Sequence, residues 1–219
     1  MGIIILSGGG DLKQTFEINQ YFVQLINKDK PLLYLPIAGD SKVRTYESSL
    51  VYIEKMFRPL GIHNITMWTD INGKTIEELN EFSAVYIGGG NTLSLLNDLK
   101  ESGFDQLLSL YFHNGGTIYG QSAGAIVLGN NILHTCGENY PFDVYAGLNL
   151  VANYSIWCHY STKDDLLIEA CLKKNQQTYI LLPDGVAVVF NEGDLSVIAK
   201  SKPKIATLNK LGKMGLKEI

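Results

Sequence analysis

Short apolar runs alternate with longer segments of helical period through the first half of the chain. The runs predict strands over Gly2–Leu6, Leu32–Ile37, Asn64–Trp68, Ala84–Ile87 and Thr117–Tyr119. The segments between them predict helices over Thr15–Asn27, Arg44–Phe57, Thr75–Asn80 and Thr92–His113, the last with a break at Gly103. Because this alternation is typical of βαβ units, we expect an α/β fold with a mostly parallel sheet and helices on both faces.

The pattern changes in the second half of the chain. Strand-like runs occur near Ile132 and Ile156 and over Tyr179–Leu182, Val186–Phe190 and Leu195–Ala199, with one clear helix over Asp164–Lys174. Turn residues separate the last three runs, which predicts antiparallel additions to the sheet. The lysine-rich tail after Lys200 is expected to be a solvated edge. With 219 residues and no linker or repeat, the chain is expected to form one domain over residues 1–219.

Composition narrows the class of protein. The net charge of −4 and the presence of only two arginines give no reason to expect a nucleic-acid partner. The N-terminal apolar run ends at Ser7 and follows no basic leader, so we expect neither a signal peptide nor a membrane span. Three cysteines (Cys136, Cys158 and Cys171) share no metal-ligand spacing. We therefore expect reduced thiols, no metal and a cytoplasmic location.

The segment Gly120-Gln121-Ser122-Ala123-Gly124 is the most informative motif. It joins a predicted strand to an apolar run that can form a helix. A serine between small residues at such a junction is typical of a nucleophile elbow, where the turn is too sharp for larger neighbours. The N–H groups at the start of the following helix would then point toward a developing oxyanion. The motif indicates a serine nucleophile.

A serine nucleophile requires a base, and the chain contains four histidines. His63 begins a predicted strand and His113 ends a predicted helix, and both positions suit structural roles. His134 lies in a strand-like run and stays a reserve candidate. His159 ends an apolar run just before a polar loop, and strand ends are where open α/β sheets place reactive groups. His159 is therefore the preferred base for Ser122.

The residues alone leave the orienting carboxylate open. Asp184 follows a buried-looking run, although Pro183-Asp184-Gly185 is also a common turn sequence. Asp143, Asp164 and Asp165 compete with it, and the last two resemble charges at a helix N-terminus.

Two glycine clusters remain, Ser7-Gly8-Gly9-Gly10 and Gly88-Gly89-Gly90-Asn91-Thr92. Each could hold an anion on backbone N–H groups or could simply permit tight packing after a strand. Neither has the spacing of a dinucleotide site or the lysine of a P-loop. The second cluster could supply one N–H to an oxyanion hole beside the elbow.

These motifs together resemble the aspartyl dipeptidase (peptidase E) and cyanophycinase family of serine peptidases. The similarity rests on Gly88–Thr92, on Gly120–Ala125, on a distal histidine and on Leu182-Pro183-Asp184-Gly185, and it extends from the first strand to about Asn191. The resemblance implies a three-layer α/β sandwich similar to the class I glutamine amidotransferases.

The resemblance also implies roles for particular residues. Ser122 matches the family nucleophile, His159 its base, and the N–H groups of Gly90 and Ala123 its oxyanion hole. Asp184 occupies the place of a family glutamate and becomes the expected orienter. Family dipeptidases bind an N-terminal aspartate through an arginine just beyond the base, which this chain lacks.

Two further residues are expected to contact substrate. Lys163 is the nearest cation to that missing arginine, and it lacks the bidentate fork. Asn91 belongs to the second glycine cluster.

The predicted function is therefore hydrolysis of short peptides by a Ser-His-Asp triad without a cofactor. Dipeptides with an N-terminal aspartate are one expected substrate class. Alternatives are a cyanophycinase-like or other small amidase, and a non-catalytic binding protein on the same fold. We expect a small peptide as partner and a monomer or homodimer.

Overall fold

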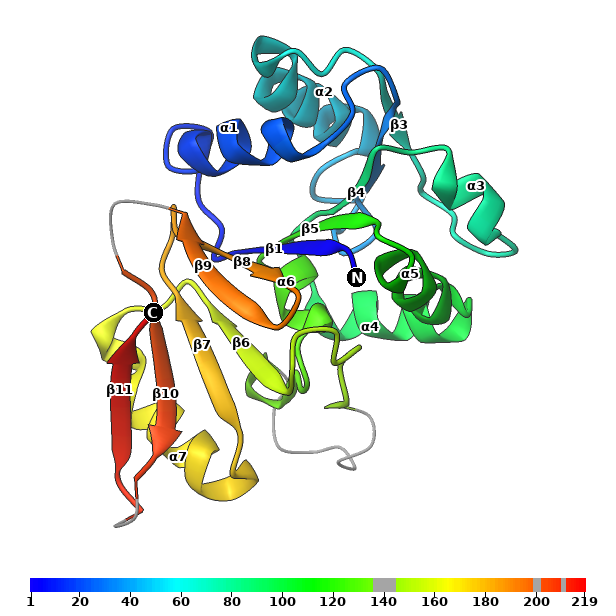
Figure 1. Ribbon diagram of the computed structural model, residues 1–219. Helices are drawn as coiled ribbons and strands as arrows, with labels where there is room; N and C mark the ends of the chain where they lie inside the picture. The colour runs from blue at the N-terminus through cyan, green and yellow to red at the C-terminus, as the bar shows by residue number, and fades with distance from the viewer. Residues whose placement is uncertain (136–144, 199–201, 210–211) are drawn as a thin grey trace.

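Seven strands form the central sheet of the molecule (Figure 1). The computed structural model describes residues 1–135, 145–198, 202–209 and 212–219. The strand order is β3-β2-β4-β5-β1-β8-β9. The strands are β1 (Ile3–Ser7), β2 (Leu32–Leu35), β3 (Ile65–Met67), β4 (Ala84–Ile87), β5 (Thr117–Gln121), β8 (Ala187–Asn191) and β9 (Asp194–Ile198). The first five are parallel, whereas β8 pairs antiparallel with β1 and β9 antiparallel with β8.

Seven α-helices and three short 3₁₀ helices accompany the strands in the described ranges. They are α1 (Phe16–Leu25), α2 (Tyr46–Phe57), η1 (Arg58–Leu60), α3 (Ile76–Asn80), α4 (Thr92–Glu101), α5 (Phe104–His113), α6 (Ala123–Leu128), η2 (Leu133–Thr135), η4 (Thr162–Asp164) and α7 (Asp165–Asn175). Helices α1 and α2 cover one face of the sheet, and α4, α5 and α6 cover the other (Figure 1). The predicted break at Gly103 is present, since this residue has φ 73° and separates α4 from α5. In the described part of the chain, no helix has the length and apolar character needed to cross a membrane.

Side chains alternate between two cores across the buried strands. In β1, Ile4 and Leu6 pack into the core shared with α4, α5 and α6. Ile5 points the opposite way, into the core with α1 and α2. Because both faces of the sheet are covered at its centre, β2 and β4 are continuous apolar runs. The predicted α/β fold with a mostly parallel sheet and helices on both faces is confirmed.

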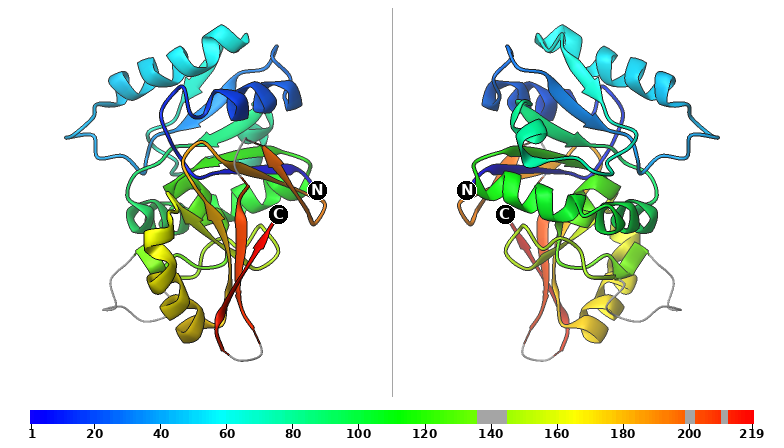
Figure 2. Two further views of the ribbon diagram at one scale, coloured as in Figure 1. Left: turned by 90° about the vertical axis from the view of Figure 1, so that its left-hand side faces the viewer. Right: turned by 90° about the vertical axis from the view of Figure 1, so that its right-hand side faces the viewer.

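A second sheet of four strands lies on the far side of the first sheet from α1 and α2 (Figure 2). Its order is β11-β10-β7-β6, with β6 (Tyr154–Cys158), β7 (Thr178–Leu182), β10 (Lys204–Leu208) and β11 (Met214–Glu218). Ile180 and Leu182 of β7 reach the core that contains α6, whereas Tyr179 and Leu181 pack with α7 on the outer face.

The second sheet corrects two expectations. The run Tyr179–Leu182 was expected to extend the main sheet, but it forms part of β7, which pairs parallel with β6. The tail contains the hairpin β10–β11, and β10 pairs with β7, so only its outer strand is an edge. The antiparallel addition to the main sheet is confirmed for β8 and β9.

The strand expected near Ile132 is absent from the described structure. Asn131 makes a single β-bridge with Ala146, and the next residues form η2. Ile132 is nevertheless fully buried in the core. Its apolar run therefore reflects burial of a short loop rather than strand pairing.

His134 lies in η2 with its ring stacked on Trp157, at 4.6 Å between centroids, and edge-on to Tyr179. Part of the residue is accessible, but both ring nitrogens are buried and have no hydrogen-bond partner among the described residues. Burial lowers the pKa of His134 to about 4. The imidazole is thus neutral in the folded protein at pH values where the unfolded chain would bind a proton.

Replacing His134 by phenylalanine should reduce the sensitivity of the fold to acid. Between pH 6.5 and pH 4 the unfolded chain binds one more proton at this residue, so stability falls as the pH falls. From pH 7 to pH 5 the wild type should lose about 2 kcal/mol more unfolding free energy than His134→Phe. Urea unfolding at the two pH values measures the difference, and equal losses in both proteins would contradict the assignment.

Candidate active site

Ser122 stands at the sharp turn between β5 and α6. Its backbone has φ 51° and ψ −113°, a sparsely populated conformation for a residue with a side chain. Its carbonyl accepts hydrogen bonds from the N–H groups of Ala125 and Ile126, each at 2.9 Å. A Cβ at Gly120 would lie 2.5 Å from the carbonyl oxygen of Gly124, so small residues are required on both sides. The predicted sharp strand-to-helix turn is present.

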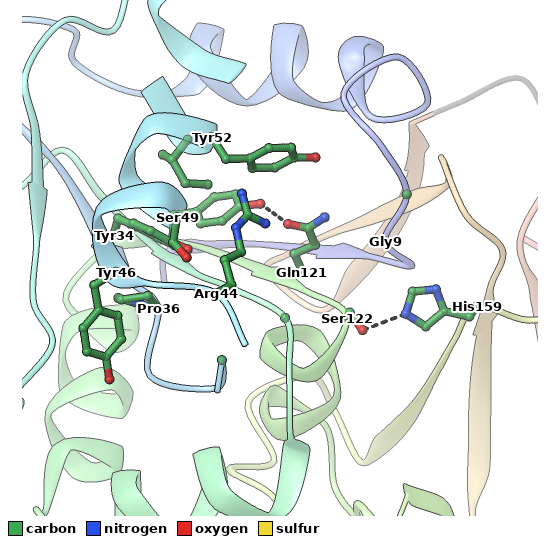
Figure 3. A pocket seen from close by; sticks show the side chains of 16 residues that line it. Gly9, Tyr34, Pro36, Arg44, Tyr46, Ser49, Tyr52, Gln121, Ser122 and His159 are labelled. Carbon is green, nitrogen blue, oxygen red and sulfur yellow. Dashed lines mark hydrogen bonds between the residues drawn. The ribbon is translucent and has the colours of Figure 1, made fainter. Parts of the chain in front are cut away.

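His159 and Asp184 complete a hydrogen-bonded chain with Ser122. Ser122 Oγ lies 2.8 Å from His159 Nε2, as drawn in Figure 3, and His159 Nδ1 lies 2.6 Å from Asp184 Oδ1. His159 follows β6, and Asp184 lies two residues beyond β7. The parallel pairing of these strands brings their carboxyl ends to one edge, and both side chains remain about half exposed.

Three consecutive carbonyl groups at the end of β1 and just beyond it link these elements. The carbonyl of Ser7 accepts from the Ser122 N–H at 3.0 Å, and that of Gly8 accepts from the His159 N–H at 3.2 Å. The carbonyl of Gly9 accepts from the N–H of Gly185, the neighbour of Asp184, at 2.9 Å. One short segment therefore fixes the backbone at or beside each of the three side chains.

The glycine cluster after β1 makes this close approach possible. A Cβ at Gly9 would lie 2.5 Å from Cε1 of His159, and a Cβ at Gly8 would lie 2.2 Å from the carbonyl oxygen of Pro183. Gly9 also has φ 105°, which side chains disfavour. Of the two interpretations of this cluster, the structure supports tight packing.

The second glycine cluster lies against the elbow. A Cβ at Gly89 would lie 3.2 Å from the Cβ of Ser122, and one at Gly90 would lie 2.0 Å from the carbonyl oxygen of Ala38. Within the described ranges, neither the Gly90 N–H nor the Ala123 N–H donates to another backbone group.

The other histidines lie apart from this chain of hydrogen bonds. His63 is exposed, and His113 ends α5 with Nδ1 2.6 Å from the carbonyl oxygen of Ser109. His134 stacks on Trp157, as described above. The structural role expected for His113, at the end of its helix, agrees with this geometry.

The competing carboxylates have other partners. Asp164 forms a capping box with Ser161, and Asp165 accepts a hydrogen bond from the Tyr160 hydroxyl at 3.0 Å. Both lie at the start of a helix, as expected from the sequence. Asp143 lies outside the described residues.

Cys158 is buried directly before the histidine. Its thiol lies 3.7 Å from the carbonyl oxygen of Ser7 and 3.6 Å from that of Ser122. Burial, with a smaller contribution from the Asp184 carboxylate, raises the pKa of the Cys158 thiol well above its usual range, so it is no thiolate nucleophile.

The remaining cysteines form no metal site in the described structure. Cys158 is a free thiol, Cys171 is a partly buried residue of α7, and Cys136 lies outside the described residues. Across the described ranges, no group of three or more His, Cys, Asp or Glu side chains is arranged to hold a metal ion.

A cavity of about 340 Å³ opens beside Ser122 and His159 (Figure 3). Its wall includes four side chains that the sequence did not single out, namely Tyr34, Arg44, Tyr52 and Tyr86. No sequence pattern links these four residues. They come from β2, β4, α2 and the loop before α2, and only the fold brings them together.

The two residues expected to contact substrate do not line this cavity. Asn91 is the N-cap of α4, and its side chain accepts the Ser94 N–H at 2.9 Å. Lys163 is an exposed residue of η4.

Solved structures share this architecture. A peptidase from an acI-B1 Actinobacterium superposes with a TM-score of 0.75 over all of this chain and 94% of that one, at 17% identity. A Listeria monocytogenes EGD-e protein described as a candidate peptidase E gives a TM-score of 0.65 over 92% of this chain and 100% of that one, at 22% identity. At these identities the similarity concerns the fold alone.

Sequence comparisons give the family. The uncharacterized peptidase Lmo0363 of Listeria monocytogenes is 29% identical over 142 residues, which cover 60% of this chain and 66% of that protein. Peptidase E of Haemophilus influenzae (strain ATCC 51907) is 30% identical over 108 residues, which cover 49% of this chain and 48% of that protein. The chain thus spans about half to two thirds of the length of these curated relatives. Residues 3–198 match peptidase family S51, and the chain belongs to that family.

Proposed function

We propose that this protein is a serine peptidase that hydrolyses short peptides through Ser122, His159 and Asp184. The observation that carries the proposal is the continuous hydrogen-bonded chain from the serine hydroxyl through both ring nitrogens to the carboxylate, at 2.8 and 2.6 Å. This is the geometry that activates an otherwise weak alcohol nucleophile. Membership of peptidase family S51 supports the same reaction class.

In the first half of the reaction, Ser122 Oγ attacks the carbonyl carbon of the substrate while His159 Nε2 takes the hydroxyl proton. The carbonyl oxygen becomes an oxyanion, and the free N–H groups of Gly90 and Ala123 would stabilise it. Asp184 holds the Nδ1 proton of the imidazole and stabilises the imidazolium. His159 then donates its proton to the leaving amine as the C–N bond breaks, which leaves an ester on Ser122.

Water completes the reaction by the same proton path. His159 takes a proton from water, the resulting hydroxide attacks the ester carbonyl, and His159 returns the proton to Ser122 as the acid product leaves. The reaction needs no group beyond the protein and water.

The size of the cavity supports a short substrate. About 340 Å³ is at the lower end of ordinary small-molecule sites, which suits a dipeptide better than a polymer. Dipeptides with an N-terminal aspartate are the substrates that we propose to test first. A β-linked aspartyl-arginine polymer tests the cyanophycinase-like alternative, and turnover of the polymer in preference to dipeptides would favour that alternative.

Ser122→Ala should abolish cleavage of aspartyl dipeptides and aspartyl p-nitroanilide, because no other hydroxyl in the described ranges is hydrogen-bonded to His159. Loss of the nucleophile in such a triad lowers kcat by about 10⁶-fold. Mass spectrometry after treatment with a serine-reactive phosphonate should show one adduct on the wild type and none on the variant. Undiminished turnover by a folded Ser122→Ala protein would refute the assignment.

Asp184→Asn should lower kcat by about 10⁴-fold, because an amide at this place favours the wrong imidazole tautomer. Phosphonate labelling of Ser122 should slow in parallel. Asp194→Asn is a matched control, since Asp194 is an exposed turn aspartate at the start of β9. A loss below about tenfold in Asp184→Asn would assign the carboxylate a structural role only.

A further inference from the structure

One cationic side chain, Arg44, lines the cavity beside Ser122. Among the described residues, the lining includes no aspartate or glutamate, and its remaining polar side chains are tyrosines, Ser49, Gln121 and the reacting pair. A site with an arginine and no carboxylate favours an anionic ligand, because the guanidinium keeps its charge at every physiological pH.

The loop before α2 holds Arg44 over the cavity. Its backbone N–H donates to the carbonyl of Asp40 at 2.9 Å, and the next residue, Thr45, caps α2. The guanidinium carbon lies 4.5 Å from the centre of the Tyr52 ring, a cation–π contact that orients the planar group. In Figure 3 the side chain extends into the cavity from the α2 side.

Arg44 has no carboxylate partner among the described residues. In the described structure its guanidinium makes one hydrogen bond, a long one of 3.5 Å from Nη2 to the carbonyl oxygen of Ser48. The other arginine of the chain, Arg58, forms an ion pair of 2.7 Å with Glu54. The two arginines at opposite ends of α2 therefore differ, and the one at the cavity keeps its fork of donors available for a ligand.

The neighbouring side chains add neutral groups and donors. Burial raises the pKa of both Tyr34 and Tyr52, more than the charge of Arg44 lowers it, so both remain neutral phenols beside the guanidinium. The Tyr86 hydroxyl donates to Oε1 of Gln121, which leaves the amide NH₂ of Gln121 as a donor. The positive charge of Arg44 is therefore not cancelled within the cavity wall.

The position of the base shows which part of a substrate would meet Arg44. His159 must protonate the leaving amine, so the leaving fragment lies toward its ring. Figure 3 shows Arg44 on the opposite side of Ser122 from His159. The acyl fragment, which stays attached to Ser122, is therefore the part that extends toward the guanidinium.

We propose that Arg44 is the specificity-determining residue of the site, and that it binds an acidic side chain on the residue that supplies the scissile carbonyl. The inference rests on the proposed peptidase function. The residue that binds the acidic side chain would then lie in the loop before α2, 78 residues before the nucleophile. The sequence had pointed instead to the segment after the base, where Lys163 lies.

The test compares aspartyl p-nitroanilide with asparaginyl p-nitroanilide, which differ in charge but hardly in shape and carry no carboxylate on the leaving group. The wild type should prefer the aspartyl compound. In Arg44→Met the aspartyl-to-asparaginyl ratio of kcat/KM should fall about 10- to 100-fold, because a charge-assisted bidentate contact is lost. Arg58→Met, which removes the arginine that follows α2 and is ion-paired with Glu54, should leave the ratio unchanged.

Different outcomes overturn different claims. If Arg44→Met lowers turnover of both compounds equally, Arg44 has a structural role and the specificity proposal fails. If the wild type is labelled on Ser122 by phosphonate and hydrolyses both compounds equally, the peptidase function stands and the specificity proposal fails. If the wild type is neither labelled nor active, the peptidase function itself fails.

A binding measurement tests Arg44 independently of turnover. Titration of Ser122→Ala with free L-aspartate, followed by NMR, should show tighter binding than with L-asparagine. Adding Arg44→Met to that protein should weaken aspartate binding at least about tenfold and leave the asparagine titration little changed. Equal affinities of Ser122→Ala for the two amino acids would overturn the assignment of Arg44.

Discussion

The site depends on three adjacent carbonyl groups, at the last residue of the first strand and the two residues after it. Those of Ser7, Gly8 and Gly9 accept hydrogen bonds from Ser122, from His159 and from the neighbour of Asp184. The segment can serve all three because its glycines leave room for backbone and for the imidazole ring. Main-chain bonds between buried elements are harder to disturb than contacts between long side chains, so the relative placement of the three groups is largely set by the fold.

Backbone strain is concentrated at the same place. Ser122 and His159 both have positive φ, 51° and 56°, although neither is glycine. Such conformations persist only where the surroundings determine them, and here Ser122 donates its N–H to Ser7 and His159 donates its N–H to Gly8. With these backbone conformations the side chains of Ser122 and His159 point toward each other, although the two residues follow strands of different sheets.

The two sheets were only partly predictable. The five parallel strands and the break at Gly103 follow from apolar runs and glycine, because strands buried on both faces leave a strong local signal. The hairpin β10–β11 leaves a weak one, since lysines interrupt its short runs and its pairing with β7 is a tertiary property. The apolar run at Ile132 led to a wrong prediction of a strand, because a buried loop has the same apolar sequence pattern as a buried strand.

Local sequence motifs identified the reacting groups of the site better than they identified the residues that surround these groups. Ser122 could be found because a sharp turn demands small neighbours, and His159 because it ends a strand. Asp184 needed a family resemblance, since a turn aspartate is ordinary by itself. Arg44 had no local signal at all, because only the packing of α2 beside the sheet brings its side chain to the cavity.

The division of the reacting groups between two sheets has a consequence for how the site forms. Ser122 belongs to the first sheet, whereas His159 and Asp184 follow strands of the second, 37 residues later and a further 25 beyond that. A chain with only its first five strands in place would therefore hold Ser122 without the imidazole and carboxylate that contact it in the complete fold. The hydrogen-bonded set of Ser122, His159 and Asp184 is therefore a property of the complete fold and not of either sheet alone.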